Sequence, residues 1–522
     1  MRTFACNTIS ARQSFFNFLL LVACVGLLSG FIASPAHSAN PLELYYQNYK
    51  ELSQKYDGQI SDLLARAKQA DDQELEAQIG KRLDLLRSQQ SQTTKHPRAI
   101  QPKLSRDLPP NIQELHFRYQ NISEDYANDL YSLAAKALKS PSPTFGFQLI
   151  NLTLIINPDH TKARSMRGYI RQGNEWMTPF ERDQLRSAKV KHPRFGWIKK
   201  SYVERYEAGE RFINKNWVSA TKEAEIRRDF SKAWVIRTEH FQIKTNHSLE
   251  KGVELGKKLE IYHDYFKQTF AAFYNSPQQI RKLLEPTTGR AKTQSQLYEV
   301  NYFRNKEEYV AKLIKRVPRI AQTNGLYQLE DRVSYFYFDP NVNNDATVFH
   351  EATHQLMYES HLKSRDIARN GHFWIVEGIA CYAESFRIIP EGDNFTYEIG
   401  APQFIRFYWA RKRLLEEGYF VTLQKFSRMG MTPYQDVTVP QLQKRYSQAS
   451  GFTHFFMHYK NGLYRNALMN YMAQIYHSSP KTQQSTRGMD HHTGVSYPAL
   501  DLQYREYIQD QQIKFGKLKV IQ

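Results

Sequence analysis

Residues 344–360 read NDATVFHEATHQLMYES, and the chemistry of the chain centres on them. Asn344 or Asp345 suits a helix N-cap, so the stretch predicts a helix. With about 3.6 residues per turn, His350 and His354 project from the same face of that helix. Two imidazoles so placed can bind one tetrahedral Zn²⁺, and Glu351 can reach a water beside the metal. The alternative is a structural histidine pair on an amphipathic helix.

A second stretch, WIVEGIA at residues 374–380, begins another predicted helix. A hydrolytic zinc site needs a third protein ligand and one open position. Glu377 stands in an otherwise apolar run, where a carboxylate is costly to bury without a partner. We therefore predict Glu377 as the third ligand. The alternative is a partly exposed carboxylate paired with a base such as Arg387.

Together the two motifs resemble those of the gluzincin peptidases, which include thermolysin-like enzymes and a class of aminopeptidases. The resemblance is strongest to an uncharacterised group of exported bacterial proteins with a peptidase-MA-like domain, over about residues 233–515. It implies His350, His354 and Glu377 as Zn²⁺ ligands and Glu351 as general base and acid. It also implies that Val333 to Phe338 form the sheet edge beside the cleft, where a peptide substrate could add as a strand. Metzincins are excluded, because Met357 and Ser360 stand where they need Gly and His.

One position departs from the gluzincin pattern. Some gluzincins carry an acidic residue four positions after the ligand glutamate, where it orients a motif histidine. Here that residue is Cys381. Glu384 could replace it, while Cys381 could be a small core residue or a fourth, inhibitory ligand.

Tyr446 is the candidate for stabilising the oxyanion. It stands in Tyr446-Ser447-Gln448-Ala449, which we expect to open an apolar helix running to Phe456, and similar Tyr-x-Gln segments occur in the resembling group. The alternative is a packing role, with His454 or another tyrosine as the donor. Asp490-His491-His492 also looks like a metal cluster, but we interpret it as a solvated loop.

Outward from these motifs, the sequence predicts an α+β, zincin-like catalytic domain with a mixed sheet over residues 233–522. Alternating or β-rich runs predict strands, and apolar periodicity predicts helices. The expected strands are His240–Thr245, Leu297–Phe303 and Val333–Phe338, and the expected helices include Leu249–Tyr274 and Glu307–Lys315.

Residues 40–232 are expected to form a helical region. Proline-rich residues 91–110 suggest a linker within it. Short helices broken at Asn157-Pro158-Asp159 are reminiscent of tetratricopeptide units, although an ordinary helical bundle fits as well. We interpret Trp176, Trp197 and Trp217 as packing anchors.

Residues 1–39 read as an export signal: a basic start, an apolar run from Phe15 to Ala33, and small residues at Ala36-His37-Ser38. The alternative is a retained membrane anchor. Only Cys381 remains after this segment, so no internal disulfide is expected. The predicted location is the periplasm, the cell envelope or the exterior.

Net charge is +19 in the 522 residues, densest between Arg186 and Lys200. Two interpretations of this positive charge are open: it keeps the protein soluble, or it attracts an anionic envelope polymer. Nucleic-acid binding is excluded, because no matching motif is present. The function predicted is that of an exported zinc peptidase with a peptide or protein substrate. Its rivals are a catalytically silent zincin-fold envelope protein, acting in binding or assembly, and a polyanion-binding helical protein.

Overall fold

The computed structural model describes residues 41–87, 98–101, 107–140, 142–285, 297–360, 366–391, 394–477 and 486–521. They form an α+β protein with an N-terminal helical region, as predicted. The predicted export signal and most of the predicted linker lie outside these residues.

The helical region begins with long amphipathic helices that bury one face each. Tyr56, Ile60, Leu130 and Ile150 are among the residues of its core. Proline occupies the first turn of α3 and of α4. The N–H groups of a first turn have no partner within the helix, so the N–H that proline lacks costs no hydrogen bond there. His160 accepts from the Ala163 N–H and so caps α5 after the predicted break. The helices are α1 Pro41–Gln69, α2 Gln73–Arg87, α3 Pro110–Lys139, α4 Pro143–Ile156 and α5 Thr161–Met166.

The second half of the region is not purely helical, contrary to the prediction for residues 40–232. It alternates three two-stranded hairpins with short helices. Trp176, Trp197 and Trp217 occupy the second strands, at intervals of 21 and 20 residues. Positive φ angles at Gly173, Asn214 and Lys215 allow the tight turns. The hairpins are β1 Ile170–Gln172 with β2 Glu175–Met177, β3 Lys189–His192 with β4 Gly196–Lys199, and β5 Glu210–Ile213 with β6 Asn216–Ser219; the helices are α6 Pro179–Arg186, η1 Lys200–Tyr202, α7 Val203–Glu207, α8 Ala220–Arg227 and η2 Phe230–Lys232.

A five-stranded mixed sheet follows, in the order β10-β11-β9-β8-β7. The prediction that Val333 to Phe338 form the sheet edge is wrong, because β11 lies between β9 and β10. Arg332, at a φ of 58°, lies where the chain reverses from β10 into β11. The two edge strands are β10, beside β11, and β7 at the other end of the sheet. The strands are β7 Trp234–Arg237, β8 Phe241–Thr245, β9 Tyr298–Phe303, β10 Gly325–Gln328 and β11 Val333–Tyr337, and β12 Arg387–Glu391 pairs separately with β13 Asn394–Glu398.

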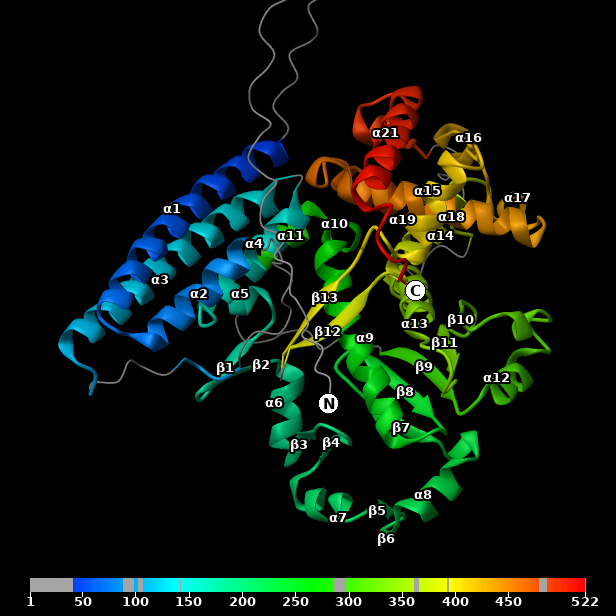
Figure 1. Cartoon of the computed structure of the whole chain (residues 1–522). Helices are drawn as coiled ribbons and strands as arrows, with labels where there is room; N and C mark the ends of the chain where they lie inside the picture. The colour runs from blue at the N-terminus through cyan, green and yellow to red at the C-terminus, as the bar shows by residue number, and fades with distance from the viewer. Residues whose placement is uncertain are drawn as a thin grey trace, which may run out of the picture. The chain divides into compact units, whose positions relative to one another are not determined.

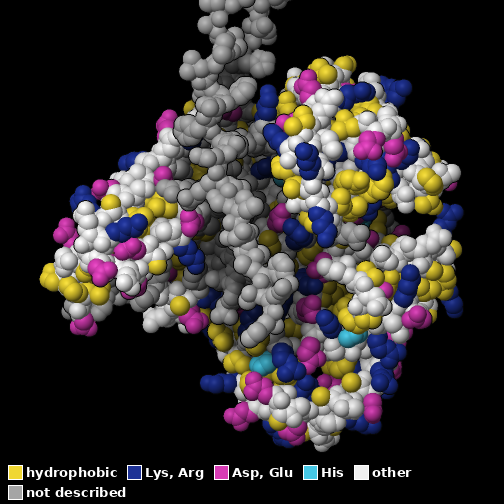
Figure 2. Space-filling model, in the orientation of Figure 1, with side chains coloured by type: hydrophobic (Ala, Val, Ile, Leu, Met, Phe, Trp, Pro, Cys, Tyr) yellow, Lys and Arg dark blue, Asp and Glu magenta, His cyan; other side chains and the backbone are white. Residues whose placement is uncertain are grey.

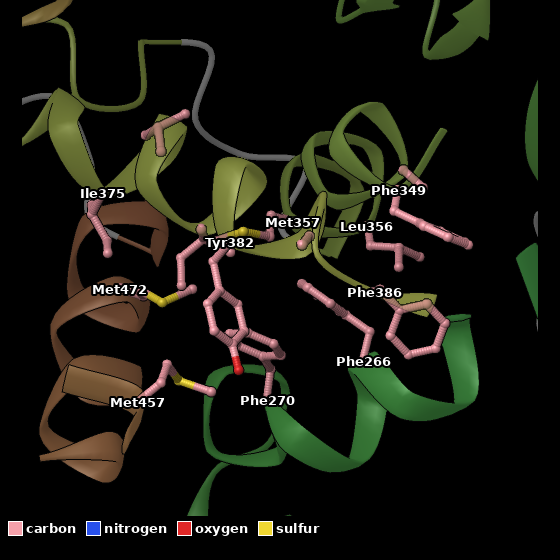
Figure 3. Packing of buried hydrophobic residues seen from close by; sticks show 14 of the residues in the cluster. Phe266, Phe270, Phe349, Leu356, Met357, Ile375, Tyr382, Phe386, Met457 and Met472 are labelled. Carbon is pink, nitrogen blue, oxygen red and sulfur yellow. The ribbon is translucent and has the colours of Figure 1, made fainter. Parts of the chain in front are cut away.

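Helices pack on this sheet and on one another, with α13 against β10 and β11 and with α14 between α13 and α18 (Figure 1). Phe266, Phe270 and Tyr382 point into one packed aromatic and aliphatic cluster (Figure 3). The helices are α9 Leu249–Thr269, α10 Ala271–Tyr274, α11 Pro277–Leu283, α12 Lys306–Leu313, η3 Ile320–Gln322, α13 Asp345–Ser360, α14 Phe373–Ala383, α15 Ile405–Leu415, α16 Leu423–Ser427, α17 Met431–Gln435, α18 Val439–His458, η4 Tyr459–Asn461, α19 Arg465–His477, α20 Met489–Thr493 and α21 Tyr497–Phe515.

Polar contacts join the helical region to α9. Asn151 donates to the Gln268 side chain at 2.6 Å, and both residues are buried. Arg167, whose side chain is 6% exposed, pairs with Asp264 at 2.7 Å.

Candidate metal centre

The α13 helix brings two imidazoles together. Phe349, Ala352 and Leu356 bury the opposite side of the helix in the core, which turns His350 and His354 outward from it. Their Nε2 atoms lie 3.2 Å apart. Two nitrogens bound to one tetrahedral Zn²⁺ at ordinary bond lengths lie about 3.4 Å apart. The pair therefore has the spacing that a shared metal requires.

Glu377, on α14, faces this pair. Its Oε2 atom lies 3.6 Å from His350 Nε2 and 3.8 Å from His354 Nε2, and the residue is 6% exposed. It does not pair with Arg387, which binds Glu398 instead. Burial raises the pKa of Glu377 to about 7, against the lowering effect of His350. One atom from each of the three residues lies within 4.8 Å of the others, so they fit a metal ion.

The approach of α14 to α18 holds Glu377 in place. A Cβ atom on Gly378 would lie 2.6 Å from Thr453 Oγ1 and 3.0 Å from the Ala449 carbonyl oxygen. Only glycine allows the two helices to pack this closely. At the start of α14, His372 has a φ of 65° and donates its backbone N–H to the Ser427 carbonyl oxygen at 2.6 Å.

Glu384 takes the orienting position that Cys381 leaves open. Its Oε1 atom accepts from His350 Nδ1 at 2.9 Å, which leaves His350 Nε2 free to face Glu377. Arg406 donates two hydrogen bonds to the same carboxylate, at 2.8 and 2.9 Å. Burial opposes ionisation, but Arg406 and His350 outweigh it and lower the pKa of Glu384 to about 2. Glu384 is therefore a permanent anion behind His350.

Cys381 is fully buried beside His350. Burial raises the pKa of its thiol. Together with His350 and Glu384 it forms another group whose ligand atoms converge, and this group shares His350 with the first.

Glu351 points toward the edge of the sheet. Its Oε2 atom accepts from the Tyr327 backbone N–H on β10 at 2.7 Å. Burial raises its pKa, against the effects of His350 and of this hydrogen bond. Glu351 is adjacent to His350 in the chain, and a raised pKa is the direction that a carboxylate needs to act as a general base near neutral pH.

The region that contains these groups has relatives. Residues 344–403 match the model of a family described as "Protein of unknown function (DUF1570)". This DUF1570 segment includes the proposed ligands and base, and the carboxylate that contacts His350: His350, Glu351, His354, Glu377 and Glu384. No curated protein matches the chain.

Tyr446 lies beyond the DUF1570 segment, on α18. The expectation that it opens a helix is wrong: α18 begins at Val439, with Pro440 in its first turn, so Tyr446 lies two turns inside. Its ring is 5.9 Å from the Arg406 guanidinium and 5.9 Å from the Tyr434 ring. Burial raises the pKa of Tyr446, and the nearby charge of Glu377 adds to the effect.

His454, the alternative donor, is not placed to act at the metal centre. Its Nε2 bonds to the Gly400 carbonyl oxygen at 2.9 Å, and its Nδ1 bonds to the Tyr507 hydroxyl at 2.7 Å. Both ring nitrogens are therefore already used in the core.

Sequence reasoning missed three further tyrosines near Glu377. Burial raises the pKa of Tyr358, Tyr434 and Tyr476, and in each case the charge of Glu377 contributes. Tyr358 lies one turn after His354, so helical spacing could have identified it. The other two come from α17 and α19, and no local spacing relates them to the motif.

The cluster at Asp490-His491-His492 lies on α20 rather than in a loop. His491 contacts Arg487 at 2.8 Å, and His492 contacts the Gln474 side chain at 2.8 Å. Asp490 lines a cavity of about 400 Å³ together with His372 and Tyr497. Among the described residues, this cluster forms no group of converging metal ligands.

Proposed function

We propose that the chain is an exported, zinc-dependent peptidase of the gluzincin type. The observation that carries the proposal is the convergence of His350, His354 and Glu377, with a 3.2 Å separation of the two imidazole nitrogens. A carboxylate base, Glu351, lies next to this set without belonging to it.

The residues of the chain divide the chemistry among them. Zinc, when bound by His350, His354 and Glu377, supplies a Lewis acid that polarises the scissile carbonyl and acidifies water. Glu351 takes the proton of the attacking water and passes it to the leaving amine. Tyr446 donates its hydroxyl to the negative oxygen of the tetrahedral intermediate.

The edge strand β10 gives the substrate a place to lie. A peptide that adds to an exposed sheet edge gains backbone hydrogen bonds in a fixed direction. Tyr327 on β10 contacts Glu351, so a peptide on this edge passes beside the base. This replaces the sequence-based expectation, in which β11 was the edge.

The proposed location and the proposed polymer contact rest on sequence. Among the described residues, no helix is both long enough and apolar enough to cross a membrane. On the face shown in Figure 2, Lys and Arg side chains are spread over the surface with Asp and Glu among them. On this face, the distribution favours a general attraction to anionic polymers over a dedicated basic groove.

The decisive experiment combines metal analysis with peptide profiling. Purified protein loaded with zinc is incubated with a proteome-derived peptide mixture, beside Glu351→Gln and His354→Ala. We expect cleavage by the parent, retained zinc but almost no cleavage by Glu351→Gln, and, with His354→Ala, loss of cleavage and of the zinc ion bound at the His350 centre. His491→Ala, at an exposed histidine, is the matched control and should behave like the parent.

Two outcomes would count against the proposal. Zinc loss from Glu351→Gln would show that the roles of base and ligand are assigned wrongly. A zinc-loaded parent that cleaves no peptide in any mixture would favour the silent zincin-fold binding protein instead.

A further inference from the structure

A second group of ligand-type side chains lies outside the candidate metal centre. It consists of His240, in the turn between β7 and β8, and of Glu260 and His263, on α9. Glu260 and His263 are three residues apart on a helix, so they share one face. One potential ligand atom from each of the three residues lies within 4.8 Å of the others.

The two α9 residues are fixed in different ways. Glu260 accepts from the His240 backbone N–H and from His240 Nδ1, both at 2.7 Å, so its carboxylate holds the turn. His263 is 5% exposed, and its Nε2 atom has no hydrogen-bond partner among the described residues. A buried imidazole nitrogen without a partner is costly, and a metal ion is one partner that removes the cost.

The surroundings carry negative charge. Glu239 lies beside His240 and accepts from the Thr178 hydroxyl at 2.9 Å. Asp264 lies next to His263 in sequence, but Arg167 already neutralises it. Glu239 and Glu260 therefore leave two carboxylates close to the imidazole pair, with Lys267 as an opposing positive charge near His263.

We propose that His240, Glu260 and His263 bind a second zinc ion, which fastens the β7–β8 turn to α9. Two imidazoles and one carboxylate are a ligand set that Zn²⁺ accepts, with water or Glu239 completing four-coordination. The site is separate from the His350 centre, so it stands or falls independently of the peptidase proposal.

Metal binding requires one rearrangement that the structure permits. The rings of His240 and His263 are stacked, with centroids 3.9 Å apart and planes at 26°. An imidazole binds a metal in its ring plane, so one ring must turn out of the stack. The His240 side chain is 25% exposed and His263 is buried, so His240 is the ring that would turn, exchanging its Nδ1 bond to Glu260 for the metal.

The test uses the full mature chain with His354→Ala, so that zinc at the His350 centre does not obscure the count. The protein is loaded with ZnCl₂, desalted and analysed for metal, and its melting temperature is measured with and without a chelator. We expect about one retained Zn²⁺ per chain. The chelator should lower the melting temperature, because the ion binds only the folded state.

Three further variants in the same background locate the ion. His263→Phe keeps an aromatic ring in the core, and Glu260→Gln and His240→Ala change partly exposed groups that folding tolerates more easily. Each should lose the retained zinc and the effect of the chelator, while His247→Ala, a half-buried histidine just after β8, should lose neither. Zinc retained by Glu260→Gln and His240→Ala would overturn the proposal, as would a His354→Ala parent that retains none.

Discussion

Glu377 links the affinity of the candidate centre for zinc to pH. Burial raises the pKa of this carboxyl group to about 7, so the metal-free site holds a proton there below neutrality. Zinc must displace that proton and also the proton of His350. Burial lowers the pKa of His350, but hydrogen bonds to Cys381 and Glu384 outweigh this effect and raise it. The affinity for zinc should therefore fall at least about tenfold for each pH unit below 7. Competition with a chelator at a series of pH values measures the effect.

The neighbouring Glu384 should contribute nothing to this dependence. Its pKa of about 2 keeps it ionised throughout the range. An affinity that does not change between about pH 5 and 7 would mean that Glu377 is already ionised without metal, or is not a ligand.

Tyr446 offers a kinetic prediction at the same scale. If its hydroxyl binds the oxyanion, Tyr446→Phe should keep zinc and fold while lowering kcat about 100- to 1,000-fold. KM should change little, because the bond forms mainly in the transition state. Steady-state kinetics on a cleaved peptide provide the readout. Tyr434→Phe removes a hydroxyl from the adjoining ring, so a slow Tyr434→Phe beside a normal Tyr446→Phe would transfer the role to Tyr434.

Local patterns in the sequence predicted the three side chains that converge at the candidate centre and much of the sheet domain. Helical spacing alone places His350 beside His354, and α13, α14, β8, β9 and β11 lie where periodicity predicts them. The sequence offered Glu384 only as one candidate for the carboxylate that orients His350. It lies seven residues after Glu377, and that spacing alone does not show whether its side chain reaches His350.

Other features could not be predicted because they depend on backbone geometry or distant packing. The edge strand β10 reads GLYQ. Its burial alternates along the strand, but four residues that begin with Gly325 are too few for a polar and apolar alternation to be recognised in the sequence. The hairpins depend on positive φ angles, as at Lys215. Lysine rarely adopts such an angle, so the residue type gives no sign of the turn. The start of α18 at Val439 was missed because the apolar run begins only near Ala449, well after the helix itself.

At the scale of elements, the contact between α14 and α18 should be intolerant of added volume. In Gly378→Ala the new methyl group would overlap Thr453 Oγ1 and the Ala449 carbonyl oxygen. We expect destabilisation by about 1–3 kcal/mol and weaker zinc binding, since Glu377 is the adjacent residue. Chemical denaturation and metal titration measure the two effects.

A helical glycine with open space provides the control. Gly80 on α2 has nothing within 4 Å of an added Cβ, so Gly80→Ala should stabilise the protein by about 0.5–1 kcal/mol through helix propensity. A Gly378→Ala protein as stable as the parent would show that α18 can shift at no cost.

For the whole molecule, the helical region and the sheet domain should unfold together. The buried Arg167 joins them through Asp264, and Asn151 joins them through Gln268. Arg167→Met should destabilise the protein by roughly 1–3 kcal/mol, towards the lower end because Asp264 is partly exposed. Urea denaturation followed by circular dichroism and by tryptophan fluorescence should give one shared transition.

The control for this variant is an exposed ion pair. Lys222→Met breaks a contact with Glu225 in which both side chains are more than half exposed, and it should cost less than about 1 kcal/mol. Two separate transitions in the parent would contradict the prediction, because the two regions would then be independent.

The hairpins of residues 170–219 and the five-stranded sheet differ in how far along the chain their partners lie. In the first hairpin Ile170 pairs with Met177, which follows closely in the chain. In the sheet Phe241 pairs with Tyr298, which is far along the chain. Short loops close sooner, so the hairpins should form early in folding and the sheet late. One support of Glu377 is α18, which begins 62 residues further on at Val439. A chain still being synthesised has both motif helices before it has α18. The peptidase proposed for it would therefore remain latent until α18 had been made and packed.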